Sequence, residues 1–217
     1  MGAIARSAAN KITTSGVFTS DAIANSSVTG ITVLAGVSAD GITLISSQTA
    51  SASASISFTT GLDSTYKAYK FVFVNCHPAT DSVSFSFNGS TDSGSNYNVT
   101  KTTSAFKAHH DEADTNTTLT YSTANDLAQS TSFQLLAEQV GNGADEQCSG
   151  SLILFNPSST TYVKHFISTS NSYNDANFSI NFYVAGYFNT TSAINAIRFQ
   201  FSSGNIDDGK IYLYGIN

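Results

Sequence analysis

Short runs in which apolar and polar side chains alternate are the feature that most constrains the fold of this chain. In the run YKAYKFVFV, residues 66–74, one side of an extended chain would carry Tyr66, Ala68, Lys70, Val72 and Val74. The other side would carry Lys67, Tyr69, Phe71 and Phe73. A period of two predicts a β-strand, and no run of the chain requires a helix.

Similar runs, separated by turn residues such as Asn88-Gly89 and Asp208-Gly209, continue to the C-terminus. We predict strands at residues 53–58, 66–74, 82–88, 97–107, 132–140, 149–155, 162–169, 178–188, 194–201 and 210–214. Phe85 and Phe87 alternate with serines, so each strand is expected to have one apolar face and one polar face. Residues 41–217 are therefore predicted to form an all-β domain, an antiparallel two-sheet β-sandwich of the jelly-roll-like kind.

Residues 1–40 lack this pattern and are predicted to form an extended N-terminal arm. Single apolar residues stand at irregular spacing among small polar ones, which leaves this segment without a core of its own. It is either an unattached leader or an arm that becomes ordered by docking on a partner or on sister copies. The candidate attachment residues are Ile4, Ile12, Val17, Phe18, Ile23, Val28 and Ile31.

Charge limits the classes of partner. Charged residues make up 11% of the chain, against roughly 25% in an ordinary soluble domain, and Ser, Thr, Asn and Gly replace them, as is typical of shell and fibre proteins. The formal net charge of -6 disfavours nucleic acid, whose binding depends on basic side chains. No apolar run is long enough for a membrane helix, and the start lacks the apolar segment of a secretory signal. We expect a chain that is made and kept in the cytoplasm and has no membrane partner.

No motif in the sequence places a catalytic group or a cofactor. The patterns G-x-S-x-G, H-E-x-x-H, G-x-x-x-x-G-K-[ST] and C-x-x-C are all absent. Cys76 and Cys148 both lie in strand-like runs, where we expect buried, reduced thiols. The sequence therefore predicts a protein that is not an enzyme and has neither cofactor nor metal.

The sharpest polar cluster is HHDEAD, residues 109–114, which invites a metal site or acid–base chemistry. In an extended chain His109 and Asp111 point to one side and His110 and Glu112 to the other, so at most two converge on one ion. We expect a solvated loop. A polysaccharide depolymerase that uses Asp111 and Glu112 is the least favoured alternative.

Polar loops are frequent recognition surfaces on sandwiches, and two loops are candidates here. Residues 89–96 and 109–116 would present the possible surface-recognition residues Ser90, Asp92, Asn96, His109, His110, Asp111, Glu112 and Asp114. Four tyrosines near predicted turns and strand ends offer rings for sugar stacking: Tyr97, Tyr121, Tyr162 and Tyr173. Host-surface glycan or protein binding is the alternative function.

Several stretches in order resemble a module of virion structural and tail-fibre proteins of marine tailed bacteriophages. They are YKAYKFVFVNCHPATDSVSFSFNGSTDSGSNYN (66–98), FKAHHDEAD (106–114), DLAQSTSFQLL (126–136), FNPSSTTYVKHFIS (155–168) and YFNTTSAINAIRFQFSSGNIDDGKIYLYGI (187–216). The similarity covers nearly everything after Gly41. In longer relatives the module sits at the end of a fibre, whereas here it follows a short arm.

The resemblance implies a non-enzymatic virion structural protein that is assembled in the host cytoplasm. A tail-fibre component, a capsid decoration and a head fibre all remain open. The expected partners are other virion proteins of the capsid or tail and sister copies in a homotrimer, since closed rings avoid open-ended polymerisation. No catalytic residues come with the resemblance.

Overall fold

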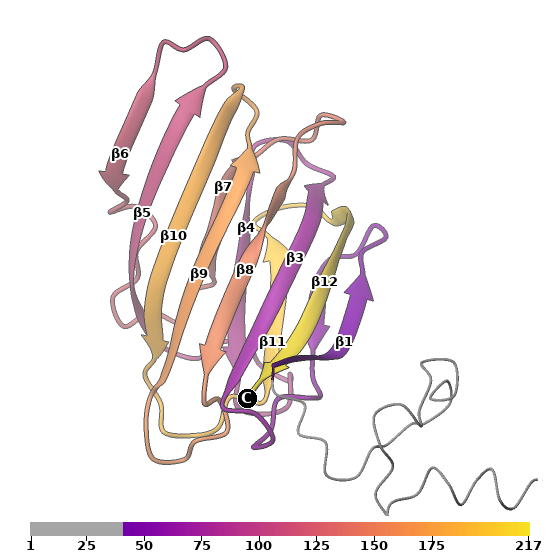
Figure 1. Ribbon diagram of the computed structural model, residues 1–217, viewed down its shortest axis with the longest axis vertical. Coiled ribbons are helices and arrows are strands. Elements are labelled where there is room, and N and C mark those ends of the chain that lie inside the picture. The colour runs from indigo at the N-terminus through magenta and orange to yellow at the C-terminus, as the bar shows by residue number, and fades with distance from the viewer. Residues whose placement is uncertain (1–40) are drawn as a thin grey trace, which may run out of the picture. The chain divides into compact units, whose positions relative to one another are not determined.

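The computed structural model describes residues 41–217, and the arm residues Ile4, Ile12, Val17, Phe18, Ile23, Val28 and Ile31 lie outside this range. The described chain contains strands and no helix, and so no helix that is long and apolar enough to cross a membrane. Two antiparallel sheets lie one behind the other, as Figure 1 shows. The predicted all-β, two-sheet antiparallel fold is confirmed.

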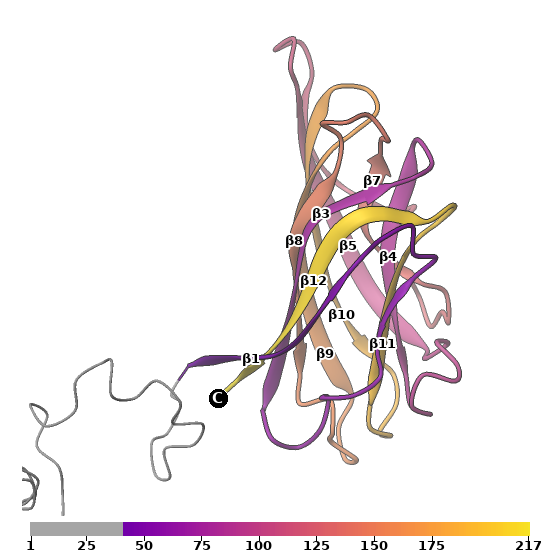
Figure 2. The ribbon, with the colours of Figure 1, turned by 90° about the vertical axis from the view of Figure 1, so that its right-hand side faces the viewer.

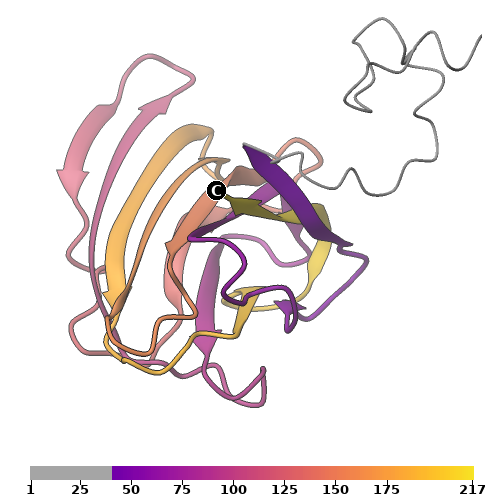
Figure 3. The ribbon, with the colours of Figure 1, turned by 60° about the horizontal axis from the view of Figure 1, so that its bottom comes forward.

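The larger sheet has eight strands in the order β1-β12-β3-β8-β9-β10-β5-β6. Figure 3 shows it curving from β6 on one side to β1 on the other. Its strands are β1 (Ile42–Thr49), β12 (Ile206–Ile216), β3 (Ala68–Pro78), β8 (Cys148–Phe155), β9 (Lys164–Tyr173), β10 (Phe178–Phe188), β5 (Lys101–Asp111) and β6 (Thr117–Tyr121).

The smaller sheet has four strands in the order β2-β11-β4-β7. They are β2 (Ile56–Phe58), β11 (Ala196–Phe201), β4 (Val83–Ser90) and β7 (Gln134–Val140). The connectivity follows the jelly-roll pattern, in which early and late strands pair as one long rolled hairpin. The pairs β2·β11, β4·β7 and β5·β6 are direct neighbours, and the β8–β9 hairpin is inserted between β3 and β10.

Phenylalanine rings from both sheets form the core. On β3, Tyr69, Phe71 and Phe73 are fully buried, as their alternation predicts. Phe199 of β11 lies 5.3 Å from the ring centre of Phe71 and 5.9 Å from that of Phe85. Because aromatic side chains bury large areas, this cluster holds the two layers together.

One bend of β12 depends on a glycine. Gly209 has φ +124, and a Cβ there would lie 2.8 Å from the carbonyl oxygen of Asn75 on β3. The register of β12 against β3 shifts on both sides of Asp208, which marks a bulge. Figure 2 shows β12 curving toward the smaller sheet. There Ile206 forms a bridge with Ser53.

Several predicted boundaries are wrong. The strand expected at 53–58 covers only Ile56–Phe58, and the strand expected at 97–107 runs from Lys101 to Asp111. Strands β1 and β6 were not predicted. A register shift between Leu44 and Ser46 breaks the alternation of β1, and β6 (TTLTY) is exposed along its whole length. Neither carries a clear period of two.

Both cysteines are free and buried, as predicted. Cys76 of β3 pairs in register with Cys148 of β8. Burial raises the pKa of the Cys76 thiol to about 12, with the charge of Asp208 as a smaller cause, and burial also raises the pKa of Cys148. Both thiols therefore stay protonated and unreactive at neutral pH.

Candidate functional site

The two predicted recognition loops lie at opposite ends of the sandwich. Strand β5 begins at Lys101, after the first loop, and ends at Asp111, where the second begins. Eleven residues of strand span ~35 Å. The structure therefore does not bring the residues at 90–96 and 109–114 together into one site.

The residues at 90–96 build a turn. Ser90 is fully buried, so its prediction as a surface-recognition residue is wrong. Its hydroxyl donates to Asp92 Oδ1 at 2.6 Å, and Asn96 Nδ2 donates to Asp92 Oδ2 at 2.7 Å. These hydrogen bonds, that from Ser90 first, lower the pKa of Asp92 to about 2. The carboxylate stabilises the turn, while Asn96 remains exposed.

The cluster at 109–114 is the end of a strand and its turn, rather than the loop that was expected. His109, His110 and Asp111 belong to β5. Asp111 Oδ1 accepts hydrogen bonds from the backbone N–H groups of Thr115 and Asn116, at 2.9 and 2.8 Å. Hydrogen bonding, from the Thr115 side chain first, lowers the pKa of Asp111 to about 2. Asp111 is thus a turn-forming acid, poorly suited to donate a proton.

The two histidines of this cluster diverge, as the alternation predicts. His109 packs edge-on to Phe178 with ring centres 5.1 Å apart. His110 Nε2 lies 3.0 Å from Asp114 Oδ1 in an exposed pair. The Glu112 backbone N–H donates to the Asn177 carbonyl and links this turn to the β9–β10 hairpin. Within residues 41–217, no three His, Cys, Asp or Glu side chains are grouped to hold a metal ion.

The outer face of the eight-stranded sheet was predicted to be polar, but it also carries most of the exposed large hydrophobic residues. Of nine exposed large hydrophobic residues in the described chain, only Tyr162 lies elsewhere. The other eight occupy outward positions on this sheet: Ile42, Leu44, Val74, Phe106, Leu119, Tyr121, Phe155 and Ile167. Outward side chains of adjacent strands that are paired in register form rows across the sheet. We call four of these rows the outer face, from the row that contains Ile42 and Thr102 to the row that contains Thr49 and Leu119.

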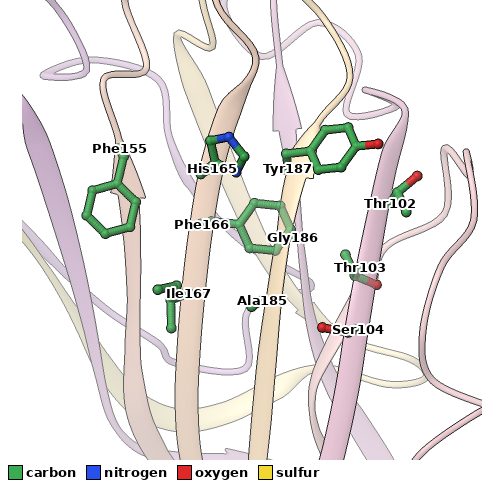
Figure 4. Close-up of a pocket in the computed structure, with 10 residues that line it drawn as sticks. All are labelled: Thr102, Thr103, Ser104, Phe155, His165, Phe166, Ile167, Ala185, Gly186 and Tyr187. Carbon is green, nitrogen blue, oxygen red and sulfur yellow. The ribbon is translucent and has the colours of Figure 1, made fainter.

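A hollow of about 580 Å³ lies in this face across β8, β9, β10 and β5, as Figure 4 shows. The rings of His165 and Tyr187 stand side by side at its upper end, 5.9 Å apart, with Phe155 beside them. Ile167 and Ala185 line its lower end in this view. Next to it, Phe106 and Tyr183 stack with their ring centres 4.7 Å apart.

The sequence contained a signal for this face. Residues 152–155 of β8 are Leu-Ile-Leu-Phe, which places apolar side chains on both sides of the strand. The run Tyr-Val-Ala-Gly-Tyr-Phe of β10 does the same. Strands that are apolar on both sides are covered on both sides. Reading every strand as half-polar missed this.

Two lysines between the sheets were also not anticipated. Lys101 is fully buried, its Nζ donates to the Ser132 carbonyl at 2.5 Å, and burial lowers its pKa to about 7. Lys164 is fully buried as well, and its Nζ donates to the Thr190 carbonyl at 3.1 Å. Each closes the end of the sandwich near the Ile42–Thr102 row, where the strands β5 and β9 begin.

The tyrosines proposed for sugar stacking do not form one site. Tyr97 is buried, with the Arg198 guanidinium 4.0 Å from its ring centre, so it is not available to a ligand. Tyr121 and Tyr162 are exposed, and Tyr173 donates its hydroxyl to Asn177 Oδ1.

No family model, no curated protein and no solved structure matches the chain. The resemblance to phage virion modules therefore stays a prediction.

Proposed function

We propose that the protein is a non-enzymatic structural component of a tailed bacteriophage particle, attached through residues 1–40 and displaying the sandwich outward. A tail-fibre part and a capsid decoration or head fibre are equally compatible with it. Its partners would be other virion proteins and sister copies in a homotrimer. It would reach the virion from the host cytoplasm, where it is assembled.

The observation that carries the proposal is the position of the two ends of the described sandwich. The described chain begins next to Ile42 of β1, and β1 is an edge strand of the larger sheet. Ile42 lies in the same row as Thr102, which is at the beginning of β5. The β5–β6 hairpin lies on the other edge, beyond Asp111 at the far end of β5. Seven strand spacings make the sheet ~34 Å wide when it is followed along its curve from one edge to the other. A chain held at one corner therefore presents the hairpin at the opposite corner.

Composition supports the same reading. Few charges and many Ser, Thr, Asn and Gly residues suit a surface that packs among neighbours, and the scattered apolar residues of 1–40 suit docking. The carboxylates of Asp92 and Asp111 accept hydrogen bonds within their own turns.

The test changes the arm within the full chain of the phage that encodes it. Val17→Asp combined with Phe18→Asp places charge on two candidate attachment residues, and Thr19→Asp with Ser20→Asp is the matched control. Quantitative mass spectrometry of purified particles measures the copies incorporated. We expect at least a tenfold loss for the first pair and near wild-type incorporation for the second. Absence of the wild-type chain from the particles, or equal incorporation of all three, would contradict the proposal.

Host-surface recognition by the β5–β6 hairpin is a second candidate function. Every residue of β6 is exposed, and Leu119 is 75% exposed at the displayed corner. A Thr117→Asp, His110→Ala chain, which is changed only beyond the Thr49–Leu119 row, should lose saturable binding to host cells while its incorporation into particles is unchanged.

A further inference from the structure

We infer that the outer face of the eight-stranded sheet is the surface through which copies of this chain associate. The inference names the surface by which sister copies contact one another. It rests on the proposed function, which supplies the expectation that the copies associate. The observations that carry it are the composition, the size and the charge of the face.

Exposed apolar side chains are concentrated on this one face. Ile167, at its centre, is 50% exposed, and Phe106 and Phe155 lie on either side of it. Single exposed apolar residues are common on soluble proteins, but a contiguous set of this kind marks an interaction site. The face is continuous across the sheet, because the registers of adjacent strands align these residues in rows.

The size of the face fits a protein partner. Seven strand spacings and three row spacings give an area of roughly 700 Å² before the side chains at its margins are counted. A stable protein interface buries about 800 Å² on each partner. A sugar would cover only part of this area.

The polar groups of the face are also poorly arranged for a sugar, which needs several free hydrogen-bonding groups at one point. The Thr102 hydroxyl already accepts hydrogen bonds from the backbone N–H and the side-chain amide of Gln129. The Asn171 amide already donates to Asn181 Oδ1 and to Ser179 Oγ. Thr102 lines the hollow, which is otherwise lined mainly by rings and aliphatic groups.

Charge favours a second copy as the occupant. Two copies that each carry a net charge of -6 repel one another, and the repulsion is smallest where the contact holds no acid. Lys70 and Lys210 are the charged residues of the outer face, which contains no Asp or Glu. The described acids lie at strand ends and in turns, as Asp92 and Asp111 do, or between the sheets, as Glu138 does. Sister chains therefore meet most favourably through this face.

The test measures the native mass of the full chain by multi-angle light scattering. Ile167→Lys places a charge at the centre of the face, and Gln200→Lys places the same charge on an outward position of β11 in the other sheet. We expect the wild-type chain and Gln200→Lys to have three times the 22.8 kDa chain mass. Ile167→Lys should fall threefold in mass, to a single chain, with an unchanged circular dichroism spectrum.

Thr169→Lys, at an exposed polar position of the same face, gives a second variant if Ile167→Lys does not fold. A monomeric wild-type chain would overturn the inference. The outer face would then be a surface for residues 1–40 or for another ligand. An assembly that survives both face variants, or that Gln200→Lys also disrupts, would overturn it too. These masses are measured without any phage particle, so the inference and the proposed function fail separately.

Discussion

The two outward surfaces of the sandwich differ in how many apolar side chains they expose. The smaller sheet presents polar side chains that are bonded to one another or to the backbone: Arg198 Nε donates to Ser57 Oγ at 2.9 Å, and Ser86 Oγ donates to the backbone carbonyl of Gln200 at 3.0 Å. The eight-stranded sheet presents Phe106, Ile167 and other exposed apolar groups. The polar surface is stable in contact with water, whereas the exposed apolar groups of the other surface are stabilised when a partner covers them.

The buried surfaces between the two sheets show how much an aromatic residue stabilises the chain when it is fully enclosed. Phe199 packs there among Phe58, Phe71, Phe73, Phe85 and Phe87, and it is fully buried. Phe199→Ala should lower the free energy of unfolding by about 3–5 kcal/mol. Phe106→Ala, on the outer face, should lower it by only about 1 kcal/mol, the value of one aromatic pair.

Urea unfolding measures both changes, in the Ile167→Lys background so that dissociation does not contribute. Equal losses at the two positions would show that the inner and outer aromatic residues are equally buried in a single chain. The contrast between the surfaces would then be wrong.

Lys101 tests the inner surface in another way, because its amino group is buried between the two sheets rather than exposed on an outward surface. Its pKa in the folded chain is about 7, below the ordinary value of 10.5, so the unfolded chain binds the proton more tightly. Stability should therefore rise as pH increases from about 7 to about 10.5, by roughly 1.4 kcal/mol for each unit of pKa shift. Below pH 7 both states carry the proton, and this contribution is constant.

Lys101→Met should remove most of that rise, which is measured as unfolding free energy against pH for the two proteins. The other ionisable groups are the same in the two proteins, so the difference between the two profiles reports on Lys101. Identical pH dependence of the two proteins would show that Lys101 keeps an ordinary pKa.

The smallest effect concerns the turns at the two ends. Asp92 and Asp111 have folded pKa values of about 2, below the ordinary 3.8. Their contribution to stability is therefore present above pH 3.8 and is lost as pH falls through about 2. Asp92→Asn and Asp111→Asn should each flatten the acid limb of the stability profile. Asp145→Asn, the control for a change of charge alone, should leave it closer to wild type, and an equal flattening in all three would refute this role of the turns.

The sequence predicted the inner surface well and the outer one poorly. The alternation of Tyr69, Phe71 and Phe73 is a local property of one strand, so the core positions of β3 follow directly from it. Ser90 was misassigned because its burial depends on Asp92 and Gly94, whose turn folds back over its hydroxyl. The burial of Lys101 was not predicted, because the sequence does not reveal that Ser132 and Phe188 enclose this side chain.

The outer face was missed for a different reason. Its members come from eight strands between residues 42 and 121 and again between 149 and 216, and only the sheet order places them in rows. The apolar runs of β8 and β10 can be seen in the sequence. An apolar residue on the outward side of one strand does not predict an apolar surface, however, until the neighbouring strands and their register are known. The arm remains a prediction from composition alone.

Thiol labelling of two single-cysteine positions tests most directly which surface is covered. The native Cys76 and Cys148 are buried and stay silent, so Thr169→Cys reports on the outer face and Gln200→Cys on the smaller sheet. The account predicts that at assembling concentrations Thr169→Cys reacts at least tenfold more slowly than Gln200→Cys, and that dilution to single chains removes the difference. Equal labelling rates at every concentration would contradict it.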